Sequence, residues 1–287
     1  MSVTKTAVDL IPASDFSYEE LVEAYNRTRV DYMVPMPMNA ARLREYAEVC
    51  DIDLEASAVA VDGSEILGLA MLGVRPGRAW ISRLGIIRSK RRQGTGWTLV
   101  THMIEQARQK GAKSIVLEVI KNNVPAHNLF IKKGFRETRE LLVLRRPPNP
   151  PPEAITEAKV ESLGYKDAVR LLGRRQAQPS WLDANESMIN AGQLSALHAV
   201  LADGSHGWLV FQNTVFQLGR LVVQTEKGDP LIVGRSLLHY LHSAHPVQDT
   251  KTENLPADDP HWPAFKELGY LVTFRRIEMI LSLTEAP

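Results

Sequence analysis

The chain has 287 residues, of which 44% are hydrophobic and 23% charged, a balance typical of a globular protein with one large domain or two ordinary ones. A formal net charge of +1 provides no basic field of the kind that binds nucleic acid. No apolar run reaches membrane length, no secretory signal is present, and the single cysteine, Cys50, excludes an internal disulfide. We therefore expect a cytoplasmic protein without nucleic-acid or membrane partners.

The first third of the chain predicts a strand, two helices and a hairpin. Asp62-Gly63 lies between two alternating apolar stretches, which is the signal of a tight β-turn. The segment between the two helices contains two prolines and cannot continue either helix. In chain order we expect a strand at residues 6–12, a helix at 18–29 capped by Asp15 or Ser17, a helix at 40–49 capped by Asn39, and strands at 57–61 and 66–74.

Residues 80–109 predict a strand, a basic glycine-containing loop and a helix. The run at 80–87 is rich in β-branched and apolar residues, and Leu99, Met103 and Ala107 follow the loop at helical spacing. Such a loop directs backbone N–H groups and the positive helix end at one point, which favours an anion such as a pyrophosphate. Gly94 and Gly96 allow close approach to the backbone.

The elements after this loop end at a run of prolines. We expect a strand at residues 114–120, a helix at 126–133 and a strand at 136–144. Five prolines then occur between Pro147 and Pro152, a composition typical of a stiff extended linker. We therefore predict two domains, at residues 1–146 and 153–287, joined by a linker at 147–152.

The spacing Arg91-x-x-Gly94-x-Gly96 resembles the acetyl-CoA loop of the GNAT superfamily of N-acyltransferases. The similarity continues through Asn123 to Gly134-Phe135 and covers about residues 5–146. It implies an α/β fold, in which a central mixed sheet is flanked by helices.

The resemblance also implies a set of cofactor contacts between the strands that end at Ile87 and Ile120. The main chain of Ile86 and Ile87 would pair with the pantetheine arm, Asn123 would lie beside that arm, and Lys132 or Lys133 could reach the 3′-phosphate. The remaining implied contacts are those of the pyrophosphate loop, namely Arg91, Arg92, Gln93, Gly94, Thr95 and Gly96.

Acyl transfer to an amine needs a base, and it is assisted by an acid that protonates the departing thiolate. In the ribosomal-protein acetyltransferases of this superfamily, a Glu placed like Glu118 acts as base; the alternative is a locally bonded carboxylate at a strand end. The resemblance implies that Phe130 lies beside the cofactor, at the position where the family usually has a Tyr that acts as the acid. Water, Tyr32 or Tyr46 would then supply the proton, or no acid is needed.

The acceptor side is less specific in sequence. The segment Asp31–Met38 falls where GNAT proteins form the acceptor wall, so Asp31 could bind an ammonium group and Tyr32 could line the pocket. Arg83 is unusual inside a strand and could bind a substrate carboxylate. We expect no metal, and the spacing His239-x-x-His242-x-x-His245 favours a solvated helix end.

The second half looks like a copy of the first. Residues 258–270 align without gaps on 123–135, placing Gly269 on Gly134, and Asp203-Gly204 repeats Asp62-Gly63. The copy lacks the Arg-x-x-Gly-x-Gly spacing and carries Glu226, Asp229 and Pro230 in its place. Carboxylates repel a pyrophosphate and proline removes an N–H donor, so we predict a degenerate GNAT-like domain.

These observations predict a tandem GNAT protein that transfers acetyl from acetyl-CoA to a primary amine, as a monomer or homodimer. One alternative is an acyl-CoA-binding sensor or scaffold without catalysis, which Phe130 favours. Another is a protein or peptide N-acetyltransferase.

Overall fold

The computed structural model describes residues 8–152 and 157–284 of the chain. These residues form two compact units. Unit 1 comprises Met1–Thr138 and Glu278–Pro287, and unit 2 comprises Arg139–Ile277. Within the described residues, no helix combines the length and apolar character needed to span a bilayer.

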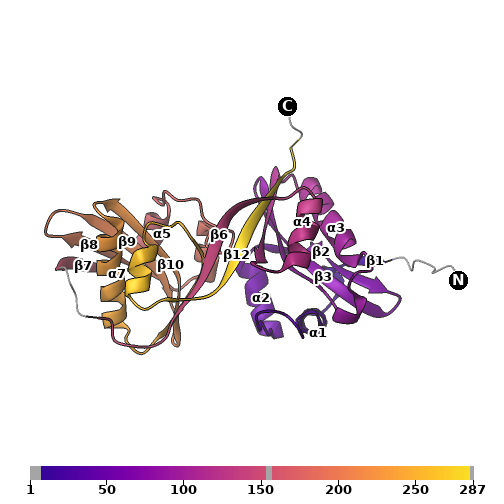
Figure 1. Cartoon of the computed structure of the whole chain (residues 1–287), viewed down its shortest axis with the longest axis horizontal. Coiled ribbons are helices and arrows are strands. Elements are labelled where there is room, and N and C mark those ends of the chain that lie inside the picture. The colour runs from indigo at the N-terminus through magenta and orange to yellow at the C-terminus, as the bar shows by residue number, and fades with distance from the viewer. Residues whose placement is uncertain (1–7, 153–156, 285–287) are drawn as a thin grey trace. The chain divides into compact units, whose positions relative to one another are not determined.

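Unit 1 contains a mixed sheet with the order β1-β2-β3-β4-β5, followed by the end of β12. From β1 to β4 neighbouring strands are antiparallel, while β4 and β5 pair in parallel across the α3 crossover. The elements, drawn from indigo to magenta in Figure 1, are β1 (Asp9–Pro12), α1 (Tyr18–Thr28), α2 (Ala40–Val49), β2 (Ile52–Asp62), β3 (Glu65–Arg75), β4 (Arg78–Ile86), α3 (Thr95–Gln109), β5 (Ser114–Ile120), α4 (Val124–Lys132) and β6 (Arg136–Arg146).

Most of these bounds confirm the sequence prediction. The first helix is capped by Ser17, whose side chain accepts from the Glu20 amide while Glu20 bonds back to the Ser17 amide, a capping box. Asn39 caps α2 through the Arg42 amide. Residues 6 and 7 of the expected first strand lie outside the described residues, and β2 begins five residues earlier than expected, at Ile52.

Helices cover both faces of the unit 1 sheet. Val59 and Val61 pack with Leu21 and Tyr25 of α1 and Leu43 of α2. The alternate positions of β2 face the other way and are also buried, because α3 packs on β2, β3 and β4. Two-sided burial explains why residues 56–61 of β2 and 67–74 of β3 are apolar at nearly every position.

Unit 2 repeats the element order of unit 1. Its sheet order is β6-β11-β10-β9-β8-β7, with β10 and β11 parallel. The elements, reddish to yellow in Figure 1, are β7 (Ala158–Leu163), α5 (Tyr165–Leu172), α6 (Asn185–Ala191), β8 (Leu194–Leu201), β9 (His206–Asn213), β10 (Gln217–Lys227), α7 (Pro230–Ala244), β11 (Asp249–Pro256), α8 (Trp262–Glu267) and β12 (Leu271–Ser282).

The backbone supports the predicted duplication at special positions. Gly134 and Gly269 both have positive φ, at 90° and 85°. Arg83 in β4 and Arg220 in β10 both adopt a left-handed conformation, at 53° and 51°, beside a register shift in their strands. Non-glycine residues rarely adopt this conformation, so its recurrence at the bulge of both units is structural evidence for a repeat.

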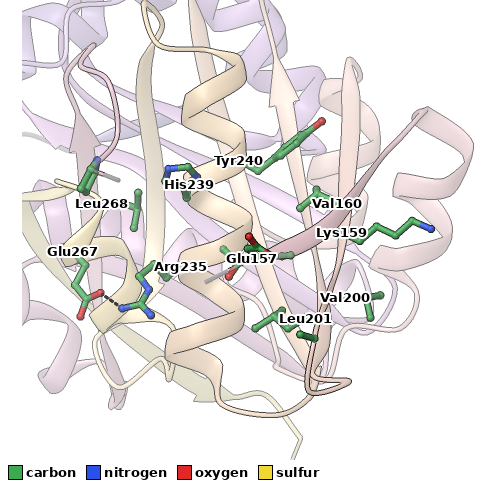
Figure 2. A pocket seen from close by; sticks show the side chains of 14 residues that line it. Glu157, Lys159, Val160, Val200, Leu201, Arg235, His239, Tyr240, Glu267 and Leu268 are labelled. Carbon is green, nitrogen blue, oxygen red and sulfur yellow. Dashed lines mark hydrogen bonds and ion pairs between the residues drawn. The ribbon is translucent and has the colours of Figure 1, made fainter. Parts of the chain in front are cut away.

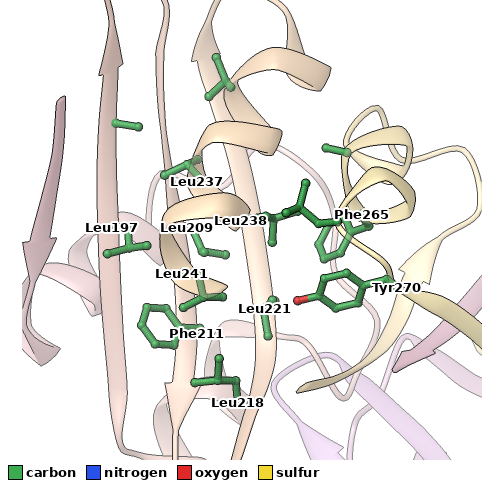
Figure 3. Packing of buried hydrophobic residues seen from close by; sticks show 14 of the residues in the cluster. Leu197, Leu209, Phe211, Leu218, Leu221, Leu237, Leu238, Leu241, Phe265 and Tyr270 are labelled. Atoms are coloured by element: carbon green, nitrogen blue, oxygen red, sulfur yellow. The ribbon is translucent and has the colours of Figure 1, made fainter. Parts of the chain in front are cut away.

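The main core of unit 2 lies between α7, α8 and the strands. Figure 3 shows Leu237, Leu238 and Leu241 of α7 packed among side chains of the strands and of α8. On the opposite face, α5 and α6 cover Trp208 and Val210. The unit is thus a three-layer structure with its own core.

The expectation of a solvated histidine run is wrong for His242. This side chain is fully buried on the inner face of α7 and is hydrogen-bonded to the Tyr270 hydroxyl at 2.9 Å. Among the described residues, no group of His, Cys, Asp and Glu could hold a metal ion.

Strands β6 and β12 each begin in one unit and end in the other. The division by internal contacts therefore falls inside β6, at Thr138, whereas the proline run predicts it after residue 146. Arg146 binds the start of that run, since its guanidinium donates to the carbonyls of Pro147 and Asn149 at 3.5 and 2.7 Å. Which segment folds independently stays a prediction that truncation can test.

Candidate functional site

The site in unit 1 begins where β4 and β5 stop pairing. The ladder runs from Arg78–Ser114 to Ile81–Leu117, although β4 continues to Ile86 and β5 to Ile120. A bulge at Arg83 lies just beyond the last pair and bends β4. The two strands therefore separate toward Ile86 and Ile120, as expected from the sequence.

The edge of β4 that faces away from β3 carries the carbonyls of Leu84 and Ile86. Arg29 donates to Leu84 O at 3.0 Å and Arg91 donates to Ile86 O at 3.1 Å. The Ile87 amide instead donates to Leu67 O of β3 at 2.9 Å. Because neighbouring residues of a strand direct their backbone groups to opposite edges, Ile86 can pair with an added chain and the Ile87 amide cannot.

The predicted cofactor loop forms a left-handed turn into α3. Gly94 has φ of 94° and is the N-cap residue, without a side-chain cap hydrogen bond, so the first amides of α3 are not satisfied by a capping side chain. The Thr95 side chain is buried, and its hydroxyl has no hydrogen-bond partner among the described residues. A buried orphan hydroxyl at this position fits a site for an oxygen-rich ligand.

The two glycines of the loop have different requirements. At position 94 glycine is required by the positive φ and not by lack of space, because a built Cβ would contact nothing within 4 Å. A Cβ on Gly96 would lie 3.4 Å from Leu129 Cδ2, an ordinary contact. The protein's own packing therefore does not require glycine at position 96. Arg92 and Gln93, the other predicted loop contacts, are exposed.

Arg91 is engaged by Asp31 rather than directed into solvent. Its guanidinium holds both carboxylate oxygens of Asp31, at 2.8 and 2.7 Å, and also donates to Thr28 O at 3.3 Å. Arg88 lies 3.7 Å from the same carboxylate. The hydrogen bonds from Arg91 hold the pKa of Asp31 below its usual value.

Glu118 lies directly after the last residue of β5 that pairs with β4. Its carboxylate accepts a 2.7 Å hydrogen bond from the Trp80 indole N–H. Tyr46 of α2 is hydrogen-bonded to Ser82 and stacks at 6.1 Å from Trp80. Burial raises the pKa of the Tyr46 phenol, which therefore keeps its proton at neutral pH. The structure thus brings the predicted carboxylate and one predicted hydroxyl to the same strand ends.

Arginine guanidinium groups contact tyrosine side chains where the acceptor is predicted to bind. The Arg83 guanidinium lies 4.1 Å from the Tyr46 ring centroid and donates to the Tyr25 hydroxyl at 3.1 Å. Arg29 lies 4.2 Å from the ring centroid of Tyr32. Arg29 and Tyr25 carry no signal in the sequence, because their contacts arise from stacking between separate elements.

Asn123 precedes α4 and Phe130 lies inside it. Asn123 caps this helix by accepting from the Ala126 amide at 3.5 Å. Phe130 is buried and packs edge-on against Phe135, with ring centroids 5.9 Å apart. Lys133 lies with its Nζ 3.4 Å above the ring centroid of Trp97, and burial lowers the pKa of this lysine.

Comparison with known proteins agrees with this geometry. Residues 18–135 match the acetyltransferase (GNAT) family. This segment of unit 1 is a GNAT domain. A search of curated protein sequences finds no match.

Solved GNAT structures extend the likeness over both units. A tandem GNAT protein from the clavulanic acid biosynthesis pathway is 13% identical, with a TM-score of 0.65, over 98% of this chain and 100% of its own. A GCN5-related N-acetyltransferase from Sphaerobacter thermophilus is 17% identical, with a TM-score of 0.68, over 98% and 97%. The glucosamine N-acetyltransferase region of a fungal multi-domain β-N-acetylglucosaminidase is 15% identical, with a TM-score of 0.70, over 95% and 38%. At these identities the likeness establishes the tandem GNAT fold alone.

In unit 2 the turn that corresponds to the glycine loop of unit 1 is filled by the protein's own side chains. Gly228 keeps a positive φ of 100°, but Asp229 caps α7 by accepting from the Leu231 amide at 2.8 Å. Pro230 is the first residue of the helix. A Cβ on Gly228 would lie 2.2 Å from the Ser205 hydroxyl, so the turn is already tightly packed.

The second unit also pairs its counterpart of Glu118. The alignment that places Gly269 on Gly134 places Glu253 on Glu118. Burial raises the pKa of Glu253, but Arg276 at 2.8 Å and Lys251 at 2.7 Å outweigh it and hold that pKa well below its usual range. A carboxylate so strongly stabilised as an anion is a poor proton acceptor.

Unit 2 contains a hollow of about 1200 Å³ between α7 and the β7–β8 pair (Figure 2). Its wall is largely apolar, and the ion pair between Arg235 and Glu267 lies on one side. The lining does not include the loop around Gly228, so this hollow does not correspond to the GNAT cofactor position. The labelled lining residues are Glu157, Lys159, Val160, Val200, Leu201, Arg235, His239, Tyr240, Glu267 and Leu268.

Proposed function

We propose that unit 1 is an acetyl-CoA-dependent N-acetyltransferase that acts on a primary amine by direct attack. The observation that carries this proposal is Glu118, placed where β4 and β5 separate and hydrogen-bonded to Trp80. The glycine turn into α3 follows the same strand β4. A proton acceptor and an anion-binding loop on adjacent elements are what acyl transfer from a CoA thioester requires.

The loop residues would hold the pyrophosphate. The backbone amides of the loop, from Arg91 to Gly96, would converge at the positive end of α3, where Gly94 and Gly96 leave the backbone accessible. The Thr95 hydroxyl would gain there the partner that it otherwise lacks. The Ile86 carbonyl would pair with the pantetheine arm once Arg91 moves from it, with Asn123 and Phe130 on the opposite side.

Glu118 would take the proton that the amine loses as it attacks the thioester carbonyl. The C–N bond forms, the C–S bond breaks, and the sulfur leaves as a thiolate that accepts a proton. Phe130 has no proton to give. The Tyr46 hydroxyl is the better placed of the two predicted donors, because it bonds Ser82 at the strand ends, while Tyr32 stacks under Arg29.

The acceptor would lie against the arginine and tyrosine side chains of α1, α2 and β4. Arg83 would contact an anionic group of the acceptor, and Tyr32 would line the entry. We propose that unit 2 does not bind the cofactor, because Asp229 and Pro230 occupy the anion position. The enzyme would act in the cytoplasm as a monomer or homodimer, without a metal or nucleic acid.

A second candidate function is an acyl-CoA sensor without catalysis, which the absent hydroxyl of Phe130 favours. Release of free thiol from acetyl-CoA, measured with a broad panel of amines, separates the two functions. Turnover that requires Glu118 supports the enzyme. Tight acetyl-CoA binding by calorimetry with no turnover for any amine, peptide amines included, would contradict it and support the sensor. Turnover with peptides alone would identify a peptide acetyltransferase.

A further inference from the structure

One guanidinium in unit 1 contacts three separate segments of the chain. Arg91 holds Asp31 with two hydrogen bonds, at 2.8 and 2.7 Å, and donates to Thr28 O at the end of α1 and to Ile86 O at the end of β4. Asp31 and Arg91 are sixty residues apart in sequence. The Arg91-x-x-Gly94-x-Gly96 spacing does not require a pair with Asp31, and the proposed proton transfer to Glu118 does not use it.

The segment of residues 29–38, called here the acceptor wall, has no regular structure of its own. Its far end is fixed by Asn26, whose side chain bonds both backbone groups of Met38, at 2.9 and 3.1 Å. Its near end is fixed by Arg29, which donates to Leu84 O of β4. The Asp31–Arg91 pair lies between these attachments and is the one among them that reaches the cofactor loop, residues 88–96.

We propose that Asp31 is a positioning residue that couples the acceptor wall to the cofactor loop. This inference rests on the proposed function and changes the role of Asp31 from a ligand of the acceptor ammonium to a link between two binding regions. A bidentate carboxylate–guanidinium pair fixes both distance and orientation, which a single charge contact does not. Arg91 and Arg88, the latter at 3.7 Å, already neutralise the Asp31 carboxylate, which therefore attracts an acceptor ammonium only weakly.

The pair is too exposed to act through overall stability. Arg91 and Asp31 side chains are 39% and 27% accessible, and ion pairs at this exposure contribute little to the free energy of unfolding. Its effect is therefore local. A ligand that restrains the loop also restrains the wall, and thermodynamic linkage requires that an acceptor held by the wall tighten cofactor binding by the same factor.

The matched control is the ion pair between Lys90 and Glu65, at 2.6 Å. Lys90 lies in the same loop, one residue before Arg91, but this pair ties the loop to the start of β3 rather than to the acceptor wall. Glu65→Gln removes one carboxylate that pairs with a loop side chain, as Asp31→Asn does. The two variants differ in which segment the lost carboxylate joins to the loop.

Hydrogen–deuterium exchange of the full chain, with and without CoA, tests the coupling without catalysis. In the wild type and in Glu65→Gln, CoA should slow exchange in residues 91–97 and also in residues 29–38. In Asp31→Asn, CoA should still protect 91–97, while 29–38 should exchange at least about fivefold faster and no longer respond. A wall that responds to CoA in Asp31→Asn as it does in the wild type would overturn the proposal.

Kinetics provide the second measurement. Asp31→Asn should raise the KM of the acceptor at least about fivefold and leave the acetyl-CoA dissociation constant unchanged or lower, because Arg88 and Arg91 lose a competing anion. Asp31→Glu keeps the carboxylate and should recover part of the loss. Weaker acetyl-CoA binding with an unchanged acceptor KM would contradict the link. If the wild type acetylates no amine, the proposed function fails, and the exchange experiment still decides the coupling.

Discussion

The Glu118 carboxylate and the Trp80 indole are joined by a 2.7 Å hydrogen bond across the strand pair β4–β5, at the point where that pair opens. The bond fixes one carboxylate oxygen and directs the side chain toward Trp80 and the neighbouring Tyr46. An oriented carboxylate at a strand separation is a reasonable general base, because proton transfer requires a fixed donor–acceptor geometry.

Glu118→Gln should lower turnover on an amine by about 10²–10⁴-fold, the usual contribution of a positioned base. Acetyl-CoA affinity should change little, since glutamine keeps the size and one acceptor oxygen. The loss should shrink at high pH, where more of the amine is already neutral. Steady-state thiol release from pH 6 to 10, with calorimetric binding of acetyl-CoA, measures both quantities.

Trp80→Phe is the companion variant, because it removes the indole donor and leaves the carboxylate. It should cost less turnover than Glu118→Gln, since the base keeps both carboxylate oxygens and loses only the bond that orients them. Wild-type turnover in Glu118→Gln at pH 7 would show that the base lies elsewhere.

The glycine loop predicts one cofactor per chain. Gly96→Ala should weaken acetyl-CoA binding with a small effect on folding, because the added Cβ would make only ordinary contacts inside the protein but would block close approach to the loop amides. Gly94→Ala should lower both binding and stability, since φ of 94° strains any side chain. Calorimetry gives the stoichiometry and thermal unfolding the stability. Two molecules bound per wild-type chain would contradict the assignment of unit 2.

Patterns local in sequence predicted most of unit 1 and the loop. The Asp62-Gly63 turn, the Ser17 and Asn39 caps and the Arg91-x-x-Gly94-x-Gly96 spacing each lie within a few residues, so their physical cause is visible in the sequence. The family resemblance, rather than periodicity, supplied the expected roles of the site residues.

Features that arise from contacts between distant segments left no such signal. The bulge at Arg83 depends on the strands and helices around it, and the Asp31–Arg91 pair depends on two loops meeting. His242 could not be distinguished from its neighbours by spacing, because its burial comes from the tertiary packing of unit 2, where its partner Tyr270 lies twenty-eight residues away. The contacts of residues 278–283 with unit 1 also depend on tertiary structure alone.

Residues 278–283 should be necessary for the stability of unit 1. The Leu283 amide donates to Lys113 O at 2.9 Å, Thr138 bonds Glu278, and Met279 is fully buried. Ending the chain after Ile277 should therefore destabilise unit 1 and weaken acetyl-CoA binding, although the family match ends at residue 135. Met279→Ala alone should cost about 2–5 kcal/mol of unfolding free energy.

A chain that ends after Leu283 is the control for this truncation, because it keeps all three of these contacts. Its thermal unfolding and its acetyl-CoA affinity should match those of the full chain. A segment 1–146 that folds and binds acetyl-CoA with wild-type affinity would show that the proline run, and not Thr138, marks the end of an independent domain.

His242 should make unit 2 sensitive to acid. Burial, with a smaller contribution from Arg146, lowers the pKa of His242 to about 3, against an ordinary value of 6.5. Between about pH 3 and pH 6.5 the His242 imidazole is therefore protonated in the unfolded chain and neutral in the folded chain. Stability from this group is complete above pH 6.5 and falls by up to about 1.4 kcal/mol for each pH unit below it.

His242→Gln tests this prediction, because glutamine can still bond the Tyr270 hydroxyl and carries no titrating group. Between pH 7.5 and pH 5, urea unfolding should show the wild type losing about 2 kcal/mol more than the variant. His239→Gln, a change on the same helix at a half-buried position, should keep the wild-type slope. An equal acid loss in the wild type and His242→Gln would mean that His242 is protonated inside the folded unit, with its charge compensated by a group other than the Tyr270 hydroxyl.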